Sequence, residues 1–487
     1  MKQETVSTVE PNAASSAKAR NFFIWFIVFS LISVSIVALI TYIVDPLQFY
    51  RKPSWYVPQY SMEQRYQNPG LARNYDYDTI IIGSSMTENF VPSYVDEVLG
   101  GKSIKLSMSG SYSHEHHLIS EAAFRTGQVK NVIWGLDYFS VKGGETMVRD
   151  DQGPFPYYLY DKNPLNDIKY LFNYTTITQT INILKGKLQG SLTLRNLDYL
   201  NNWDYYAVYG TESVLKDLKR AEAVEPSYVK TEEDFEEIKK AFDANILSLV
   251  KEHPETEFIF YYPPYHVLRH YVWYELNPKR YNNQQQFKQY VWDTLSEYPN
   301  AKIFDFQAVE EVTFDSNNYK DLSHHTLEIN EWIIQSMANG DHQVTDETIG
   351  KMISDLDKQV ENLDISQFDT DSIQIVYQGE NVPAGANPVA QEDALYIPIK
   401  ALVILKGAAL GWEEETKSSL VEWNDGIVKL KQGSTEMKVN GETVQLSQPA
   451  QIIDGSMMIP IEALSYFGLQ GEWQQGNQQV LITELVQ

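Results

Sequence analysis

The chain has 487 residues, of which 43% are hydrophobic, and it carries a formal net charge of −26. This length exceeds what one ordinary hydrophobic core accommodates, so it predicts two or three folded domains. The acidic balance argues against nucleic acid as a partner, because duplex binding depends on lysine and arginine side chains that neutralise phosphates. The sequence contains no cysteine, which excludes disulfides, thiolate metal sites, a cysteine nucleophile and a lipidated N-terminal cysteine.

An uncharged apolar run of 23 residues, 22–44, lies close to the N-terminus. At about 1.5 Å rise per residue, a helix of this length crosses the roughly 30 Å hydrocarbon layer of a membrane. Lys18 and Arg20 precede the run, so the positive-inside rule places the N-terminus in the cytoplasm. We therefore expect a cytoplasmic tail at 1–20, a single membrane anchor at 21–44 and export of the remainder. The alternative is a cleaved signal peptide, but the run is too long and no cleavage site with small residues follows it.

After a connector at 45–75, whose four prolines favour an extended chain, short apolar runs alternate with amphipathic segments. The expected strands are 78–82, 103–108, 131–136, 257–262 and 301–306, and the expected helices between them include 116–126, 232–253 and 283–297. This order predicts a flavodoxin-like, three-layer α/β/α domain at 76–340 with a mostly parallel sheet. In such domains, ligands bind beyond the carboxyl ends of the strands.

The third and fourth expected strands are separated by an unusually long insertion, 139–229, which is rich in aromatic residues. Long insertions in compact domains often form lids or binding loops. The aromatic rings could stack on sugar rings, or they could form the small core of the insertion itself. Both interpretations are open from the sequence.

An acidic segment at 341–375 reads as a linker that is partly helical and partly disordered. It leads into an internal repeat, in which 395–402 is echoed by 457–464, with an Asn-Gly hairpin at 437–444 between the copies. We expect a small α+β domain at 376–487. It is similar to the copper-amine-oxidase N-terminal-like stalk domain of exported bacterial proteins. Despite the name of that family, we expect no copper site here, because this part of the chain lacks the histidine and cysteine side chains that copper prefers.

Two short motifs at opposite ends of the main domain carry the candidate chemistry. Gly83-Ser84-Ser85 directly follows the first expected strand, where a serine presents its hydroxyl to the cleft and its amide at the start of a helix. Far downstream, Asp321 precedes His324 by three residues in one turn. An aspartate so placed can bond the Nδ1 atom of the imidazole and leave Nε2 free to act as a base.

This pair of motifs, in this order, resembles the SGNH (GDSL-like) family of hydrolases and acyltransferases. The resemblance implies that Ser85 is the nucleophile, and that His324 and Asp321 complete a catalytic triad. The glycine of the second family motif would be Gly110, whose amide would form an oxyanion hole together with the amide of Ser85. The third motif departs from the family, because Asp137 stands where an asparagine is usual. An ionised carboxylate cannot donate to an oxyanion, so another group serves there or Asp137 orients Ser85 or the substrate.

Other polar side chains near the expected cleft have less specific patterns. His114 opens a His-Glu-His-His run that lacks zinc-helix spacing, so it is either a substrate contact or part of a polar helix start. Tyr265 follows the fourth expected strand and is a candidate substrate or orienting residue. His266 and His270 have helical spacing suited to a metal, but no third ligand is evident, and we expect no metal site.

Within the SGNH family, the anchor and both motifs look most similar to membrane-tethered proteins that act on envelope polymers. These are DltD-like proteins of teichoic-acid D-alanylation and AlgX- or AlgJ-like proteins of polysaccharide O-acetylation. The resemblance implies an esterase or O-acyltransferase, without a cofactor, acting on a cell-wall polymer or exopolysaccharide, with a membrane acyl-donor protein as a further partner. The alternative is a non-catalytic polymer-binding or scaffolding protein on the same fold, which Asp137 and the appended stalk domain favour.

Overall fold

The computed structural model describes residues 13–151, 153–368, 373–382, 384, 386–391, 394–414, 416–423, 426–453, 455–474 and 479–485. The chain divides into two compact units. The first comprises the described residues up to Tyr75 together with Pro154–Asn196. The second comprises Asp76–Gly153 together with the described residues from Leu197 onward.

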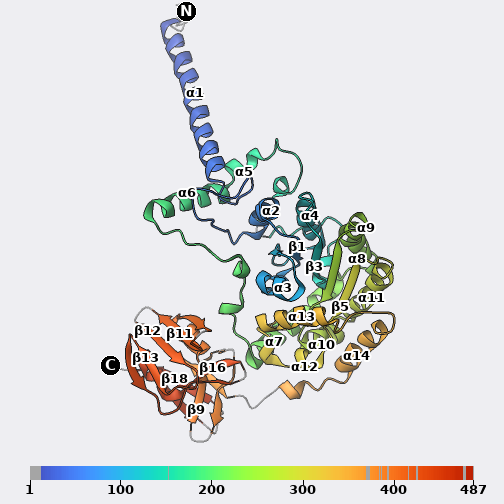
Figure 1. Cartoon of the computed structure of the whole chain (residues 1–487), viewed down its shortest axis with the longest axis vertical. Helices are drawn as coiled ribbons and strands as arrows, with labels where there is room; N and C mark the ends of the chain where they lie inside the picture. The colour runs from blue at the N-terminus through green and yellow to red at the C-terminus, as the bar shows by residue number, and fades with distance from the viewer. Residues whose placement is uncertain are drawn as a thin grey trace, which may run out of the picture. The chain divides into compact units, whose positions relative to one another are not determined.

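The first unit is built on α1 (Ala13–Val44), a long helix whose segment Arg20–Val44 includes an 18-residue stretch with a mean hydropathy of 2.8, none of which is buried within the structure. By length and composition this helix can cross a membrane, a criterion that a signal sequence near an N-terminus also meets. Figure 1 shows two shorter helices at the carboxyl end of α1. The other helices of the unit are α2 (Gln64–Asn74), α5 (Ile168–Phe172) and α6 (Tyr174–Gln189).

The chain turns at Asp45, directly after α1, in a left-handed backbone conformation with φ of 49°. The Asp45 carboxylate accepts hydrogen bonds of 2.8 to 2.9 Å from the amides of Phe49, Tyr50 and Arg51. It also accepts the hydroxyl of Tyr170, from α5, at 2.7 Å. Burial raises the pKa of Asp45, and these four donors oppose the rise because they stabilise the charged form. The carboxylate thus fixes the direction in which the chain leaves α1.

The expectation of an extended connector at 45–75 is wrong in its second half, where α2 forms with Pro69 inside it. Proline has no N–H, so the carbonyl of Arg65, four residues earlier, loses its helical partner. That carbonyl instead accepts the hydroxyl of Tyr160 at 2.7 Å. The tertiary hydrogen bond removes much of the cost of the proline, which the local sequence could not reveal.

The second unit contains a five-stranded sheet in the order β2-β1-β3-β4-β5, with every pairing parallel. This is the flavodoxin-like order, and it confirms the predicted α/β class. The strands are β1 (Thr79–Ile82), β2 (Ser103–Lys105), β3 (Asn131–Gly135), β4 (Glu257–Tyr262) and β5 (Ala301–Asp305).

Helices cover both faces of this sheet, as the three-layer prediction requires (Figure 1). On one face, Val95 of α3 and Ile333 of α13 join a buried cluster with Ile81 and Ile133 of the strands. On the other face, Trp134 of β3 meets His116 of α4, and Tyr262 of β4 meets Phe287 of α11. The covering helices are α3 (Pro92–Leu99), α13 (Leu327–Asn339), α4 (Ser113–Phe124), α8 (Phe235–Phe242), α9 (Ser248–Glu252) and α11 (Pro278–Leu295).

A further helical group contains α7 (Thr211–Tyr228), α10 (Val267–Leu276) and α14 (Ile349–Glu361). Leu218, Val272 and Leu356, one from each helix, share a buried cluster with Leu322. Part of the long insertion is therefore core of the second unit. The predicted acidic linker is helical over α14, while residues 369–372, where disorder was also expected, lie outside the described residues.

The remainder of the second unit, from residue 373, is rich in strands, and its repeat pairs with itself. β9 (Ala394–Pro398) lies antiparallel to β16 (Ser456–Pro460), with Ile397 opposite Ile459. The predicted hairpin is also present, because β13 and β14 flank Asn440 and Gly441, which have φ of 51° and 89°. The other elements are β6 (Gln374–Tyr377), β7 (Glu380–Asn381), β8 (Val389–Gln391), α15 (Lys400–Lys406), β10 (Ala409–Glu413), β11 (Ser418–Trp423), β12 (Gly426–Lys431), β13 (Glu436–Val439), β14 (Glu442–Gln445), β15 (Gln451–Ile453), β17 (Leu469–Gln474) and β18 (Gln479–Glu484).

Candidate active site

Ser85 lies directly beyond the carboxyl end of β1 and opens a short 3-10 turn, Ser85–Thr87. The turn depends on Gly83, because a Cβ atom there would lie 2.6 Å from the Cγ2 atom of Thr87. Ser84 caps the turn by accepting the amide of Met86 on its hydroxyl at 3.3 Å. Gly83 and Ser84 therefore shape the turn that places the Ser85 side chain at the edge of the sheet.

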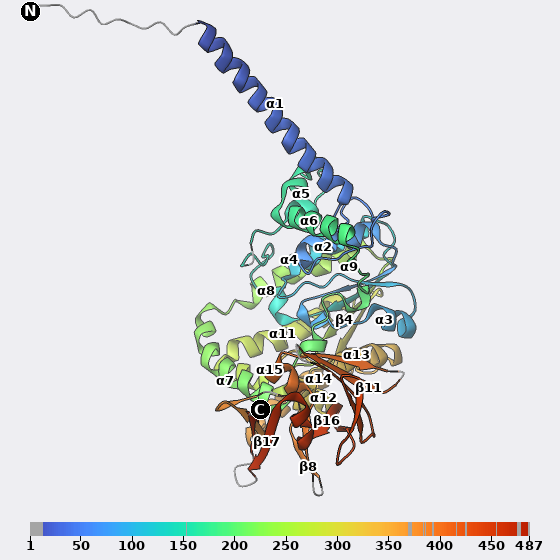
Figure 2. The same cartoon turned by 90° about the vertical axis from the view of Figure 1, so that its left-hand side faces the viewer.

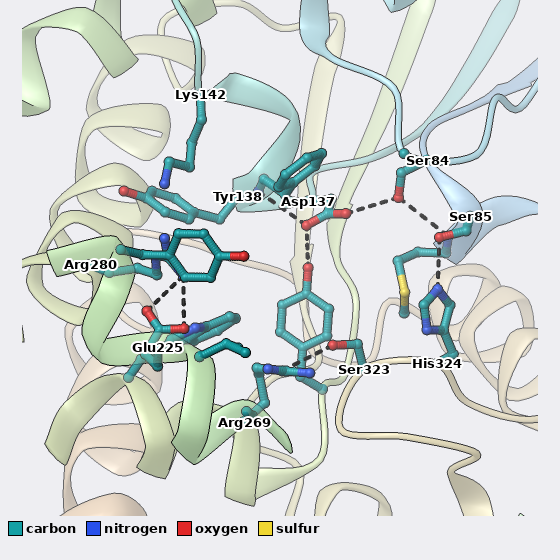
Figure 3. A pocket seen from close by; sticks show the side chains of 18 of the residues that line it. Ser84, Ser85, Asp137, Tyr138, Lys142, Glu225, Arg269, Arg280, Ser323 and His324 are labelled. Atoms are coloured by element: carbon teal, nitrogen blue, oxygen red, sulfur yellow. Dashed lines mark hydrogen bonds and ion pairs between the residues drawn. The ribbon is translucent and has the colours of Figure 1, made fainter. Parts of the chain in front are cut away.

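His324 reaches Ser85 from a loop that precedes α13. The Nε2 atom of His324 lies 2.7 Å from the Oγ atom of Ser85, 239 residues away in the sequence, and Figure 3 shows the ring pointing at the hydroxyl. On its other side, the Nδ1 atom lies 2.8 Å from Oδ2 of Asp321. A carboxylate can only accept, so Nδ1 carries the proton and Nε2 is left to accept the hydroxyl proton of Ser85.

Asp321 is anchored by its own backbone turn. Its Oδ1 atom accepts the amides of Ser323 at 2.8 Å and His324 at 2.9 Å. Burial alone would raise the pKa of Asp321, but the charge of His324 and the hydrogen bonds from both amides lower it below its usual value. The side chain is therefore ionised throughout the physiological range.

Trp203, from the long insertion, packs against this arrangement. Its Nε1–H donates to the carbonyl of Ser85 at 3.3 Å, and its ring meets that of His324 edge-on at 5.3 Å. The ammonium of Lys320 lies over the same ring at 3.7 Å. Burial lowers the pKa of Lys320. This tryptophan thus contacts both the serine backbone and the imidazole, and it shields one side of the pair from water.

Asp137, which follows β3, accepts from two hydroxyl groups. Ser84 donates to its Oδ2 atom at 2.9 Å (Figure 3). Tyr265 donates to its Oδ1 atom. Burial, followed by the charge of Asp137, raises the pKa of Tyr265 well above its usual range, so its hydroxyl keeps the proton that it donates. Asp137 therefore organises Ser84 and Tyr265 and does not contact Ser85 directly.

A cavity of about 480 Å³ opens in front of Ser85 and His324 and extends toward α7 and α10. Gly110, Asp137 and Tyr265 also line it. Its far end is aromatic and charged, and is formed by Tyr138, Lys142, Arg220, Glu225, Tyr228, Arg269, Trp273 and Arg280.

The arginines at the far end of the cavity are held in place by acidic partners. Arg280 pairs with Glu225 and Glu232, each at 2.7 Å. Arg269 bonds Asp217 at 3.0 Å and the hydroxyl of Ser323 at 3.2 Å. Such pairing fixes the direction of the guanidinium groups and offsets their charge, so this end of the cavity is polar without being strongly cationic.

Asp217 of α7 links the insertion to the histidine loop, because the same carboxylate oxygen accepts from Arg269 and from the amide of Leu322 at 3.0 Å. Asp217 and Trp203 were not among the site residues predicted from the sequence. Neither lies in a recognisable motif, and both act through contacts across more than one hundred residues. Arg269 had a weak signal, since it follows Tyr265 beyond the fourth strand.

Of the other histidines singled out in the sequence, His114 and His266 have hydrogen-bond partners elsewhere in the fold. His114 does not line the cavity, and its Nδ1 atom lies 3.1 Å from the side-chain oxygen of Asn245. His266 is the N-cap of α10, where its Nδ1 atom accepts the amide of Leu268 at 3.2 Å, and burial lowers its pKa to about 3. Burial likewise lowers the pKa of His270. Among the described residues, neither His266 nor His270 belongs to a group of three side chains close enough to hold a metal ion.

Comparisons with known proteins bear mainly on the C-terminal part of the chain. Residues 376–482 match the family described as copper amine oxidase N-terminal domain, which confirms the resemblance of the repeat. Among solved structures, the chain is similar to a protein from Streptococcus pneumonia provisionally assigned as a platelet activating factor, with 13% identity over 57% of this chain and 89% of that chain, at a TM-score of 0.28. A likeness at that TM-score supports no conclusion about this chain. No curated protein is significantly similar to the chain.

Proposed function

We propose that this chain is a membrane-anchored, extracytoplasmic serine esterase or O-acyltransferase of the SGNH type. The observation that carries the proposal is the line of three groups Ser85, His324 and Asp321, with 2.7 Å and 2.8 Å between successive partners. The line lies at the carboxyl edge of a parallel sheet with flavodoxin-like order, where such folds place their sites. It opens on a cavity large enough for a sugar ring.

The proposed first step transfers an acyl group to the enzyme. The Oγ atom of Ser85 attacks the ester carbonyl while its proton moves to Nε2 of His324. The amides of Ser85 and Gly110 receive the oxyanion of the tetrahedral intermediate. Collapse of that intermediate breaks the bond to the leaving alcohol, which takes the proton from Nε2 and leaves an acyl-Ser85 ester.

The second step returns the acyl group to a hydroxyl. His324 takes a proton from water or from a polymer hydroxyl, and the resulting oxygen nucleophile attacks the acyl-Ser85 ester. Collapse restores the Ser85 hydroxyl with the proton held by His324. Water gives an esterase, and a polymer hydroxyl gives an O-acyltransferase. No metal ion takes part in either step of this scheme.

The far end of the cavity supports a carbohydrate substrate. Trp273 and Tyr228 offer ring surface, with the guanidinium carbons of Arg269 and Arg280 at 5.6 and 5.3 Å from the respective ring centres. Rings beside paired charges suit sugars, whose apolar faces stack on aromatics while their hydroxyls bond charged groups. An acylated cell-wall polymer or exopolysaccharide is the substrate class we propose, and α1 would keep the enzyme at the membrane facing that polymer.

The nucleophile can be identified with a fluorophosphonate probe, which phosphonylates activated serines and is read by mass spectrometry of the full chain in detergent. We expect one adduct, on the peptide that carries Ser85, and none in Ser85→Ala. Ser84→Ala is the neighbouring control and should still form the adduct on Ser85, at a reduced rate, because the Ser84 hydroxyl caps the turn and is directed at Asp137. An unlabelled parent chain that still retains envelope polymer in a pull-down would instead favour the scaffolding alternative.

Asp137 is expected to act by positioning. Asp137→Ala should lower kcat for ester hydrolysis between about ten- and a hundred-fold, because Ser84 and Tyr265 lose their common acceptor and the serine turn shifts. Labelling of Ser85 by the probe should persist at a reduced rate. Asp137→Asn keeps an acceptor oxygen and should recover much of the loss. Complete loss of labelling in both variants would contradict a positioning role.

A further inference from the structure

The first unit carries an exposed apolar surface that the proposed chemistry does not use. On α6, Tyr174, Ile181 and Leu188 are 83%, 45% and 88% exposed and recur at intervals of seven residues. Seven residues complete nearly two helical turns, so the three side chains form one stripe along the helix. Thr180 and Ile183 of the same helix are buried. The stripe is thus the outward face of a helix whose other face is packed.

Segments next to α6 in the first unit carry further exposed apolar side chains. Leu165, Ile168 and Leu194 are 84%, 57% and 69% exposed. Trp55 is also exposed, and the ammonium of Lys187 from α6 lies over its ring at 5.1 Å. Single exposed apolar side chains are common on proteins, but many of them on one small unit indicate an interaction surface. We refer to Trp55 and the exposed apolar residues of 165–194 as the α5–α6 surface.

The α5–α6 surface is fastened to the last turn of α1. Val44 and Ile183 share a buried cluster. The hydroxyl of Tyr170 accepts the amide of Leu47 at 3.1 Å and donates to Asp45. Figures 1 and 2 both show α5 and α6 at the carboxyl end of α1, with α6 running across the direction of α1. A membrane crossed by α1 would therefore end at the level of this surface.

The charge of this segment differs in sign from that of the whole chain. Pro154–Asn196 contains five basic residues and two acidic ones, whereas the whole chain carries a net charge of −26. The basic residues are Lys162, Lys169, Lys185, Lys187 and Arg195. A helix that combines an apolar stripe, flanking lysines and interfacial Tyr and Trp side chains has the composition of helices that lie in the headgroup layer of a membrane. Its basic residues complement anionic lipid headgroups.

We propose that the α5–α6 surface rests in the outer-leaflet headgroup layer of the membrane that α1 crosses, and that it recognises anionic lipid. The inference relies on the membrane anchoring in the proposed function. The α6 stripe is immersed in the headgroup layer, while the buried face of the helix holds the first unit together. The enzyme would then be fixed to the membrane at two places, the span and the surface beside it.

The test uses the cysteine-free sequence, which permits single labels. Full-length Leu188→Cys is labelled with the environment-sensitive fluorophore NBD and reconstituted into vesicles of phosphatidylcholine and phosphatidylglycerol. Asn182→Cys, on the flank of the same helix, is the matched control, and Ser33→Cys in the middle of α1 reports the anchor. Quenching by nitroxide-bearing lipids is compared with quenching by aqueous iodide.

We expect lipid nitroxides near the headgroups to quench the Leu188 label roughly two-fold or more strongly than the Asn182 label. Iodide should show the reverse order. Equal access of iodide to both labels, with the Ser33 label quenched by lipid, would overturn the surface proposal and leave the anchor intact; the α5–α6 surface would then await a protein partner. A Ser33 label open to iodide would instead refute the membrane span on which both proposals rest.

Discussion

Ser85→Ala and His324→Ala are each expected to lower the turnover of a small ester such as p-nitrophenyl acetate by about three orders of magnitude or more. Ser85 supplies the only atom that bonds the acyl group in the proposed first step. His324 supplies the only base within hydrogen-bonding distance of that atom among the described residues, at 2.7 Å. The two groups act as one unit, so the double variant should be no slower than either single variant.

The measurement compares kcat for the full chain in detergent, with secondary structure checked by circular dichroism. Ser227→Ala is a suitable control, because this α7 hydroxyl bonds only the carbonyl of Val224 among the described residues. It should leave kcat unchanged. Turnover within ten-fold of the parent in Ser85→Ala would show that another group is the nucleophile, whatever the geometry around His324.

Short motifs explain why much of this site could be anticipated from the sequence. Gly83-Ser84-Ser85 is a local solution for directing a hydroxyl from a strand end, and Asp321 orients His324 within a single turn. The alternation of strands and helices then predicts a parallel sheet with one edge where such residues collect. Each of these motifs is encoded within a few neighbouring residues, so each can be recognised in a single sequence.

The rest depends on contacts that no local pattern encodes. Trp203 and Asp217 lie in the long insertion, whose aromatics could be read either as sugar contacts or as core. In the structure, Trp203 packs against the backbone of Ser85 and the ring of His324, a role that neither interpretation describes. Asp217 accepts a hydrogen bond from the amide of Leu322, which is distant in the sequence and near only in the folded chain. His114 was expected near the edge of the cleft, but its hydrogen-bond partner Asn245 lies in the π-helical segment Asp243–Leu247, more than one hundred residues away in the sequence.

Asp321→Asn is expected to lower kcat by about three orders of magnitude while leaving Ser85 and His324 in place. Oδ1 of Asp321 accepts two backbone amides, and Oδ2 accepts the Nδ1 proton of His324. In asparagine one of these positions becomes an NH2 donor. The backbone amides of Ser323 and His324 both need an acceptor, so the side-chain oxygen of the asparagine turns toward them and its NH2 group faces Nδ1 of His324. The imidazole then carries its proton on Nε2, where it cannot accept the proton of Ser85.

The kinetic test of Asp321→Asn is the pH dependence of kcat for p-nitrophenyl acetate, with Asp150→Asn, an exposed carboxyl, as the control. The deficit should be large at neutral pH and should shrink in strong base, where hydroxide can remove the Ser85 proton directly. A variant within three-fold of the parent at pH 7 would contradict the tautomer argument. Loss of probe labelling together with loss of folded structure would instead point to damage of the loop.

The lowered pKa of Asp321 in the folded chain also predicts how Asp321→Asn changes the free energy of unfolding as the pH varies. A carboxyl whose pKa is lower folded than unfolded stabilises the fold above its unfolded pKa, near 3.9, and loses that contribution as pH falls through the folded pKa. The difference in free energy of unfolding between the parent and Asp321→Asn should therefore be largest near pH 7 and narrow below about pH 4. Denaturant unfolding of the two chains at both pH values measures it. A difference that widened in acid would mean that the charged carboxyl destabilises the fold. Asp321 and His324 could then not form the ionised arrangement that catalysis requires.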